Sequence, residues 1–308
     1  MTVRDPFHEG ERAVQERAGE THAAALNEGI LGSSIAPGAI PFISKQPWVI
    51  LAGADPEGRL WCSALMSEAG FMAATPDGTE VKLDLRRAPV HPSNPLLAFH
   101  SLGRPTGALF IELATRRRLR VNGCIAQATA EWLTIAVEQA FPNCPRFIKK
   151  RTVVEQKEKP QASKEATSGK ILGEAERALI HAADTLFLAT LHPERGVDAS
   201  HRGGTSGFVE VLDGSRLRVP DYPGNGLFNS FGNLAVDARM GMLFPVFGSG
   251  GLLHLSGTAR VMWDQPDPEG KTAGTCRFLE FSLERWVLTP PAAGAPGWRF
   301  VEASPSIG

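Results

Sequence analysis

The sequence lacks the cysteine patterns that mark metal or disulfide proteins. Its four cysteines, Cys62, Cys124, Cys144 and Cys276, lie far apart in the 308 residues. They form no CxxC pair, and no histidine stands beside them at the spacing of a zinc site. We therefore expect reduced thiols, a cytoplasmic protein and no metal site.

Long apolar runs and an excess of one charge are also missing. No stretch approaches the roughly 18 consecutive apolar residues of a membrane helix, and the N-terminal segment has no apolar signal core. The formal net charge is −1, which gives no general attraction to nucleic acid or to an acidic membrane surface. These absences predict a protein without nucleic-acid or membrane partners.

Two common phosphate-binding motifs are absent. No GxGxxG sequence follows a predicted strand. Gly270-Lys271-Thr272 resembles only the end of a phosphate loop, because Gln265 stands where the first glycine should be. A bound cofactor would therefore be held by side chains and loops.

Polar and glycine residues concentrate in residues 198–233. Residues 209–212 and 216–219 indicate two short strands joined by Asp213-Gly214, a tight-hairpin signal. A cation, hydroxyls and amides surround this hairpin, and such a set suits a phosphate and a polar ring edge. The candidate site residues are Ser200, His201, Arg202, Gly203, Pro220, Asp221, Tyr222, Asn225, Phe228, Asn229, Ser230 and Asn233.

The two halves of the chain contain diverged copies of one β-rich unit. Residues 48–71 and 186–208 each show an apolar strand, a turn with Pro and Gly, a second strand and Gly-Phe. The segments that begin at Thr106 and Met240 also match. Alternating apolar residues with short turns predict antiparallel barrels rather than a parallel sheet with crossover helices.

We therefore predict a mainly β protein with flanking helices, of the α+β class, with two tandem barrels. Residues 1–148 would contain an N-terminal helix and the first repeat, 149–170 a charged linker, and 171–308 the second repeat. Helices are expected over residues 7–27, interrupted near Gly19, and over 171–183. The tail from residue 290 is expected to lie along the surface.

Several ordered motifs of the second repeat resemble a known family. The runs ADT-LFLAT, DASHRGG, GFV, PDYPGN, FNSFGN and GMLFP are similar to the FMN-binding split β-barrel superfamily, specifically the proteins related to pyridoxamine 5'-phosphate oxidase. The whole chain resembles a two-barrel branch of unassigned function. The resemblance implies two split antiparallel β-barrels, FMN in a groove where two barrels meet, and a homodimer. Whether the groove forms within one chain or between chains stays open.

The resemblance also implies roles for the candidate residues. The segment from Ser200 to Gly203 would be the first FMN-contacting strand and the segment from Pro220 to Asn233 the second. Arg202 would bind the phosphate. The usual Ser-Arg-Lys phosphate cluster of the family is replaced here by Gly-Asn and Asn-Ser.

The sequence is equally compatible with purely structural roles for the same residues. The three asparagines of the second segment could cap turns, and Arg202 could form a surface ion pair. His201 could be a packed histidine without a proton-transfer role, and Tyr222, the only tyrosine of the chain, could serve packing alone.

The first repeat lacks the polar set. Ala64, Leu65 and Met66 stand where the second repeat has His-Arg-Gly, so we expect this repeat to supply structure or a wall of the groove without its own flavin site. One feature is present in this repeat alone. Arg116, Arg117 and Arg118, followed by Arg120, form a predicted hairpin tip that could hold an anionic substrate or be a solvated turn.

Three functions follow from these residues. The first is an FMN-dependent oxidoreductase with a small-molecule substrate or electron donor, and the second is a non-catalytic flavin or tetrapyrrole binding or storage module. The third is a structural protein with a lost flavin site. No acid, base or nucleophile stands out, so no catalytic residue is predicted. Oxidation of pyridoxamine phosphate is not expected, because the tail offers only Trp298-Arg299 in place of the Arg-containing substrate segment of the true oxidases.

Overall fold

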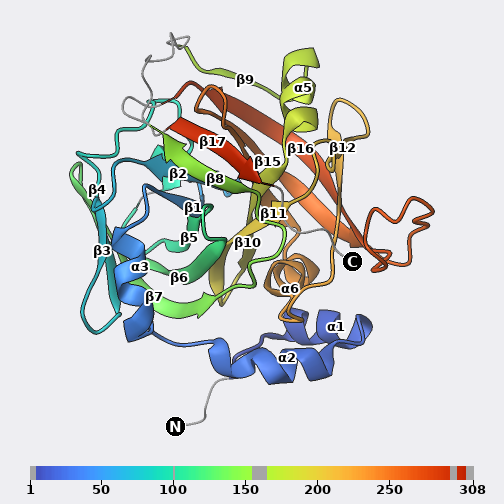
Figure 1. Ribbon diagram of the computed structural model, residues 1–308, viewed down its shortest axis with the longest axis horizontal. Helices are drawn as coiled ribbons and strands as arrows, with labels where there is room; N and C mark the ends of the chain where they lie inside the picture. The colour runs from blue at the N-terminus through green and yellow to red at the C-terminus, as the bar shows by residue number, and fades with distance from the viewer. Residues whose placement is uncertain (1–4, 100, 155–164, 292–296, 303–308) are drawn as a thin grey trace.

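The computed structural model describes residues 5–99, 101–154, 165–291 and 297–302. Its strands form two large antiparallel sheets, with helices at their ends and edges (Figure 1). This arrangement confirms the predicted mainly β, α+β class. Residues 155–164 of the predicted linker, and residues 292–296 and 303–308 of the predicted tail, lie outside the described residues.

The first sheet has seven strands in the order β2-β1-β5-β6-β7-β4-β3. Every neighbouring pair in it is antiparallel. The strands are β1 (Trp48–Ala54), β2 (Leu60–Met66), β3 (Met72–Ala74), β4 (Glu80–Asp84), β5 (Pro105–Glu112), β6 (Arg117–Ala128) and β7 (Trp132–Pro142).

The second sheet repeats this order as β11-β10-β14-β15-β16-β13-β12, and β9 adds to β16. Both repeats also carry a bulge at the same place, after Asn122 in β6 and after Ser256 in β15. The shared order and the shared bulge confirm two tandem split barrels. The strands are β9 (Thr167–Gly169), β10 (Thr185–His192), β11 (Gly196–Gly203), β12 (Glu210–Val211), β13 (Arg216–Pro220), β14 (Arg239–Val246), β15 (Gly251–Met262) and β16 (Phe278–Thr289).

The N-terminal helix is interrupted near Gly19, as predicted. Helix α1 (Glu9–Arg17) begins with a capping box between His8 and Glu11, and α2 (Thr21–Asn27) follows after Gly19, whose φ is 69°. The helix predicted over residues 171–183 is α5 (Glu174–Ala182). Shorter elements are η1 (Glu28–Ile30), η2 (Pro37–Ala39), α3 (Ile40–Ser44) and α4 (Leu96–Phe99).

Helix α6 (Asn229–Val236) was not predicted from the sequence, because Asn, Ser and Gly favour turns over helix interiors. Tertiary packing stabilises it. A Cβ atom on Gly10 would lie 2.2 Å from the carbonyl oxygen of Gly232, so the backbones of α1 and α6 meet directly. Figure 1 shows α1 and α2 below α6, at the bottom of the molecule.

The uninterrupted apolar sequence of β1 is explained by burial of both its faces. Val49 and Leu51 pack in the core of the first barrel, whereas Trp48 and Ile50 pack in a separate cluster between the barrels. Phe187 of β10 belongs to the same inter-barrel cluster. Because successive side chains of a strand point to opposite faces, β1 and β10 contribute to both layers.

Two glycines at equivalent positions allow the barrels to approach closely. A Cβ atom on Gly107 in β5 would lie 2.7 Å from the backbone nitrogen of Ala199 in β11. A Cβ atom on Gly241 in β14 would lie 2.8 Å from the carbonyl oxygen of Leu60 in β2. The polar strand β11 is therefore held against the sheet of the first repeat.

Part of the predicted linker and part of the tail pair with each other. Strands β8 (Lys150–Val154) and β17 (Gly297–Glu302) form a two-stranded sheet, and the Trp298 ring lies 4.8 Å from the Trp48 ring of the inter-barrel cluster. The proposed domain boundaries themselves stay a prediction.

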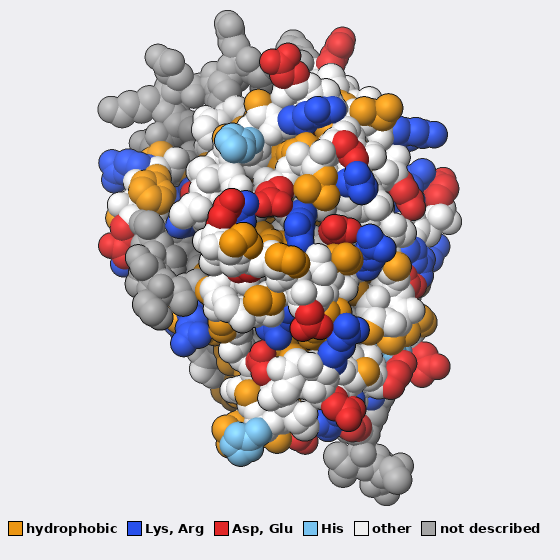
Figure 2. Space-filling view, turned by 90° about the vertical axis from the view of Figure 1, so that its right-hand side faces the viewer, with side chains coloured by type: hydrophobic (Ala, Val, Ile, Leu, Met, Phe, Trp, Pro, Cys, Tyr) orange, Lys and Arg blue, Asp and Glu red, His pale blue; other side chains and the backbone are white. Residues whose placement is uncertain are grey.

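Charges of both signs intermingle on the face of the molecule shown in Figure 2, in keeping with the net charge of −1. Among the helices that the structure describes, none is long and apolar enough to span a membrane.

Candidate functional site

A cleft lies between the two repeats of the single chain. Its walls come from β11, the chain after β13 and the start of α6 in the second repeat, and from β6 and residues 141–147 in the first. Its cavity volume is about 130 Å³. Since one water needs roughly 10–15 Å³, the cleft has room for a larger group. The sequence left open whether the groove forms within one chain or between chains, and this cleft forms within one chain.

The cleft gathers most of the predicted site residues. His201, Arg202, Gly203, Asp221, Tyr222, Asn225, Phe228, Asn229, Ser230 and, from the hairpin tip, Arg118 line it.

Five candidates lie outside the cleft wall. Ser200 is buried behind it with its Oγ 3.0 Å from Ser230 Oγ, and Pro220 is buried at the end of β13. The Asn233 side chain bonds to His8 and Thr190. Arg116 pairs with Glu302, and the guanidinium of Arg117 lies over the Phe42 ring. Only Arg118 of the three hairpin arginines therefore reaches the cleft.

The first repeat was expected to supply structure or a wall of the groove, but Phe141, Asn143 and Phe147 were not named from the sequence as part of that wall. Arg120, Phe141, Asn143 and Phe147 all line the cleft. The sequence named Arg120 only as part of the predicted hairpin tip; in the structure it is 8% exposed and lies on the face of β6 opposite Leu119 and Val121. Its guanidinium is 2.9 Å from Asp198 and from Asn229, so it ties β6 to both β11 and α6.

Positive charge dominates the cleft. The lining residues include four arginines, at positions 118, 120, 146 and 202, and two carboxylates, Glu20 and Asp221. Both carboxylates are bonded to Arg277. Within the described ranges, Arg118, Arg146 and Arg202 form no ion pair, which rules out the surface ion pair considered for Arg202.

Burial and mutual repulsion act on these cations. Burial, with the charges of Arg120 and Arg202, lowers the pKa of Arg118 to about 9. Burial also lowers the pKa of Arg202 and raises that of Asp221. A partly buried group of like charges is costly in free energy, and an anion in the cleft would offset this cost.

The tautomer of His201 follows from its neighbour. Arg118 Nη1 lies 3.2 Å from His201 Nδ1, and a guanidinium can only donate, so Nδ1 accepts. Burial, followed by the charge of Arg118, holds the His201 pKa well below its usual range. The ring is therefore neutral, with its proton on Nε2.

Three N–H groups of the cleft lining lack an acceptor. They are Arg118 Nε, Arg120 Nε and His201 Nε2, none of which has a hydrogen-bond partner in the part of the chain that the structure describes. Unsatisfied buried donors are rare in native proteins. A ligand rich in acceptor oxygens would satisfy them.

Aromatic rings and strained backbone also lie in the cleft wall. Phe147 and Tyr222 stack with centroids 4.6 Å apart and an interplanar angle of 17°. Phe147 and Phe228 have φ values of 66° and 56°, a left-handed conformation that bulky residues seldom adopt. Such strain is typical of ligand sites, where the surroundings hold it in place.

Asn225 has the turn-capping role that the sequence left open for the three asparagines of the second segment. Asn225 Oδ1 accepts a hydrogen bond from the Leu227 backbone within its own turn, and its carbonyl oxygen accepts one from Asn27. Asn229 instead bridges Arg120 and Glu11. Asn225 therefore shapes the loop, and Asn229 fixes a guanidinium of the cleft.

The equivalent place in the first repeat is nearly closed. The strand registers identify the counterparts. Ile50 pairs with Ala64 in the first repeat, and its equivalent Phe187 pairs with His201 in the second. In the same way, Leu109 pairs with Arg120, and its equivalent Leu243 pairs with His254. The counterparts of His201 and Arg120 are thus Ala64 and His254. The cavity beside Ala64 is about 10 Å³, which is room for roughly one water.

We expect His254 to make the protein acid-sensitive. Burial lowers its pKa to about 4 from the ordinary 6.5. Below pH 6.5, His254 therefore binds a proton in the unfolded chain but stays neutral in the folded chain. The free energy of unfolding falls as the pH falls from 6.5 toward 4. Between pH 6.5 and about pH 5 the loss from this group should be about 2 kcal/mol.

Urea unfolding of wild type and His254→Asn at neutral pH and at about pH 5 measures this effect. Asparagine can keep the donor to the Cys62 carbonyl oxygen that His254 Nδ1 supplies. The acid-induced loss should be smaller in the variant by about 2 kcal/mol. His8 and His201 titrate in both proteins, so equal losses would contradict the role of His254.

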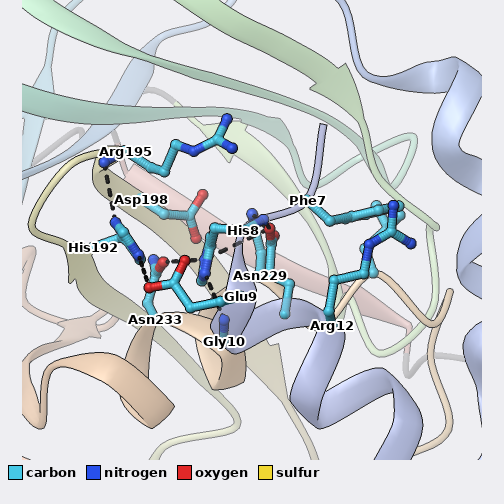
Figure 3. Close-up of polar contacts among 12 residues, drawn as sticks. Phe7, His8, Glu9, Gly10, Arg12, His192, Arg195, Asp198, Asn229 and Asn233 are labelled. Carbon is cyan, nitrogen blue, oxygen red and sulfur yellow. Dashed lines mark hydrogen bonds and ion pairs between the residues drawn. The ribbon is translucent and has the colours of Figure 1, made fainter. Parts of the chain in front are cut away.

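A cluster of His8, Glu9 and His192 outside the cleft has atoms close enough to hold a metal ion. The hydrogen bonds oppose that use (Figure 3). Nδ1 of His8 accepts from the Gly10 N–H, and Nδ1 of His192 accepts from the Glu194 and Arg195 N–H groups. Both rings therefore carry their proton on Nε2, the nitrogen that faces the cluster. A metal-ligating histidine normally donates through its other nitrogen.

Comparisons with known proteins leave the function open. No family model and no curated protein matches the chain. Solved structures do match it. A putative pyridoxamine 5'-phosphate oxidase of Lactobacillus delbrueckii is 17% identical with a TM-score of 0.31, and it covers 38% of this chain and 94% of its own.

Two other solved structures match to a similar extent. The heme storage protein of Vibrio cholerae is 15% identical with a TM-score of 0.26, and covers 41% of this chain and 95% of its own. An F420 reductase is 16% identical with a TM-score of 0.26, and covers 39% of this chain and 97% of its own. Similarities at this level do not assign a function, which we infer from the cleft.

Proposed function

We propose that the inter-repeat cleft binds FMN and that the protein is an FMN-dependent oxidoreductase of a small-molecule substrate. The observation that carries this proposal is the group formed by Arg118, His201 and Arg202. Two guanidiniums without a carboxylate partner flank a neutral imidazole whose Nε2–H lacks an acceptor. This donor set fits an anion with several oxygens, of which a phosphate is the best match.

The remaining residues of the cleft fit the other parts of FMN. The first turn of α6, Asn229 to Phe231, lines the cleft, and its N–H groups add the positive end of a helix dipole to the guanidiniums. Phe147 and Tyr222 offer aromatic faces to a planar ring. When bound, FMN would supply hydride and electron transfer, while the protein supplies binding and orientation.

His201 would act as a fixed donor toward the cofactor. Its Nδ1 is occupied by Arg118 and its pKa is far below its usual range, so the ring stays neutral and its Nε2–H keeps one direction. The same tautomer argues against a bound heme, because the nitrogen that would ligate iron carries the proton.

A first experiment measures the visible spectrum of the purified protein and its change as FMN is added. We expect one FMN per chain, because the equivalent place beside Ala64 has neither the room nor the cations. Reduction of the bound flavin by NADH or NADPH, and reoxidation by air, would support the enzyme. Two FMN per chain, or no saturable binding at micromolar FMN, would contradict the proposal.

Binding without turnover is the second candidate, and one observation favours it. Both carboxylates that line the cleft are bonded to Arg277, so neither is free for proton transfer. Flavin that binds but is not reduced by either nicotinamide donor would support this alternative. The homodimer, the cytoplasmic location and membership of the two-barrel branch stay predictions.

A further inference from the structure

A second cavity lies on the other side of Asn229 from the cleft. It has a volume of about 300 Å³ and is bounded by α1, residues 31–33, β6, β7 and the chain from residue 194 to 198. Figure 3 shows Asp198, Asn229 and His8 gathered here. The cavity differs from the cleft in the sign of its charge.

Two carboxylates lie at the bottom of this cavity. Glu11 is 3% exposed and Asp198 is 2% exposed. Glu11 accepts hydrogen bonds from His8 N and Asn229 Nδ2, and Asp198 accepts from Arg120 and Asn122. Each carboxylate oxygen retains room for a second donor.

An independent observation points to a missing donor in the same cavity. Asn122, which lines it and is 7% exposed, donates through Nδ2 to Asp198 and Gln139. Its Oδ1 has no hydrogen-bond partner among the residues described. A buried carbonyl oxygen without a donor is costly, so a ligand that donates would be favoured here.

The other charged groups around the cavity leave it acidic. Asp5 is paired with Arg12, and Arg195 donates to the Asp5 carbonyl oxygen. Glu138 and Glu194 also line the cavity. Burial lowers the pKa of His8 to about 4, so this ring adds no positive charge. Burial, with a contribution from Asp198, raises the pKa of Glu11 to about 7, as expected for a carboxyl group without a counterion.

We propose that this cavity binds the primary ammonium group of a small organic molecule, held by Glu11, Asp198 and Asn122 Oδ1. An ammonium group has three N–H donors and no acceptor, which matches three acceptor groups. Its positive charge would balance that of Glu11, because Asp198 already pairs with Arg120. The acidic rim attracts cations, whereas the arginine-lined cleft repels them, so the two sites take different ligands. This inference does not depend on FMN.

Calorimetric titration with butylammonium chloride at about pH 8, where Glu11 is ionised, tests the site. We expect saturable binding to the wild type that weakens at least about tenfold, or 1.4 kcal/mol, in Glu11→Gln. Asn122→Ala should also weaken the binding of butylammonium. Glu16→Gln is the matched control, because Glu16 is exposed on the same helix and should leave binding unchanged.

Two further salts at equal ionic strength identify the chemistry of the ligand. Tetramethylammonium has the same charge but no N–H donor, and we expect it not to bind or to compete. Potassium should compete no better than tetramethylammonium. The proposal is overturned if butylammonium shows no saturable binding, if Glu11→Gln binds it as the wild type does, or if either salt competes equally well.

Discussion

Replacement of Arg118 by methionine should weaken FMN binding by a factor of roughly 30 or more, since truncating one partner of a buried charge pair costs about 2–5 kcal/mol. Arg118 presents to the cleft a guanidinium without a carboxylate partner, and it also fixes the tautomer of His201. Without FMN, the variant should lose little stability, because removal of a partly buried charge without a counterion offsets the loss of the hydrogen bonds to His201 and to the Cys144 carbonyl oxygen. Flavin titration and urea unfolding measure the two effects.

Arg117→Met is the matched control. Arg117 is the neighbouring residue on β6, but its guanidinium lies over the Phe42 ring outside the cleft. This variant should keep the wild-type affinity for FMN. Equal affinities for FMN in Arg118→Met and in the wild type would show that the phosphate does not lie against Arg118.

The second large effect concerns stability. Replacement of Arg120 by methionine should destabilise the protein by about 3–5 kcal/mol, because Asp198 would remain buried without its cation. The Arg120–Asp198 pair joins β6 of the first repeat to β11 of the second at 2.9 Å, with side chains 10% and 3% exposed. Urea unfolding would measure the loss, and Arg120→Met combined with Asp198→Asn should recover part of it.

An exposed ion pair provides the comparison. Arg260 pairs with Glu280 across β15 and β16, and its side chain is 73% exposed. Arg260→Met should cost no more than about 1 kcal/mol. If Arg120→Met costs no more than Arg260→Met, the inter-repeat ion pair does not stabilise the fold.

The repeat was predictable because it depends on local patterns. The alternating residues of β7 and β16, and the apolar runs of β1 and β10, mark the same strands in both halves. Side-chain alternation and turn residues act over a few positions, so they are visible in the sequence. Helix α6 was missed because contact with α1, more than two hundred positions away, stabilises it.

The polar half of the candidate site could also be located from the sequence. His201, Arg202, Asp221 and Tyr222 lie in one stretch whose composition does not suit a buried core. The cluster of His8, Glu9 and His192 could not be predicted from the sequence, because His192 lies far along the chain from the other two residues.

The sequence by itself determined the two barrels, the helices α1, α2 and α5, and the segment that carries the second-repeat side of the cleft. Only the tertiary structure decided that Arg118 and Arg120 face this segment, that Arg116 and Arg117 do not, and that the cleft forms within one chain. The physical reason is that a strand's alternation selects a face, whereas the partner of that face depends on how the two barrels pack. Here the close approach of β5 to β11 at Gly107 brings a pair of first-repeat arginines beside His201.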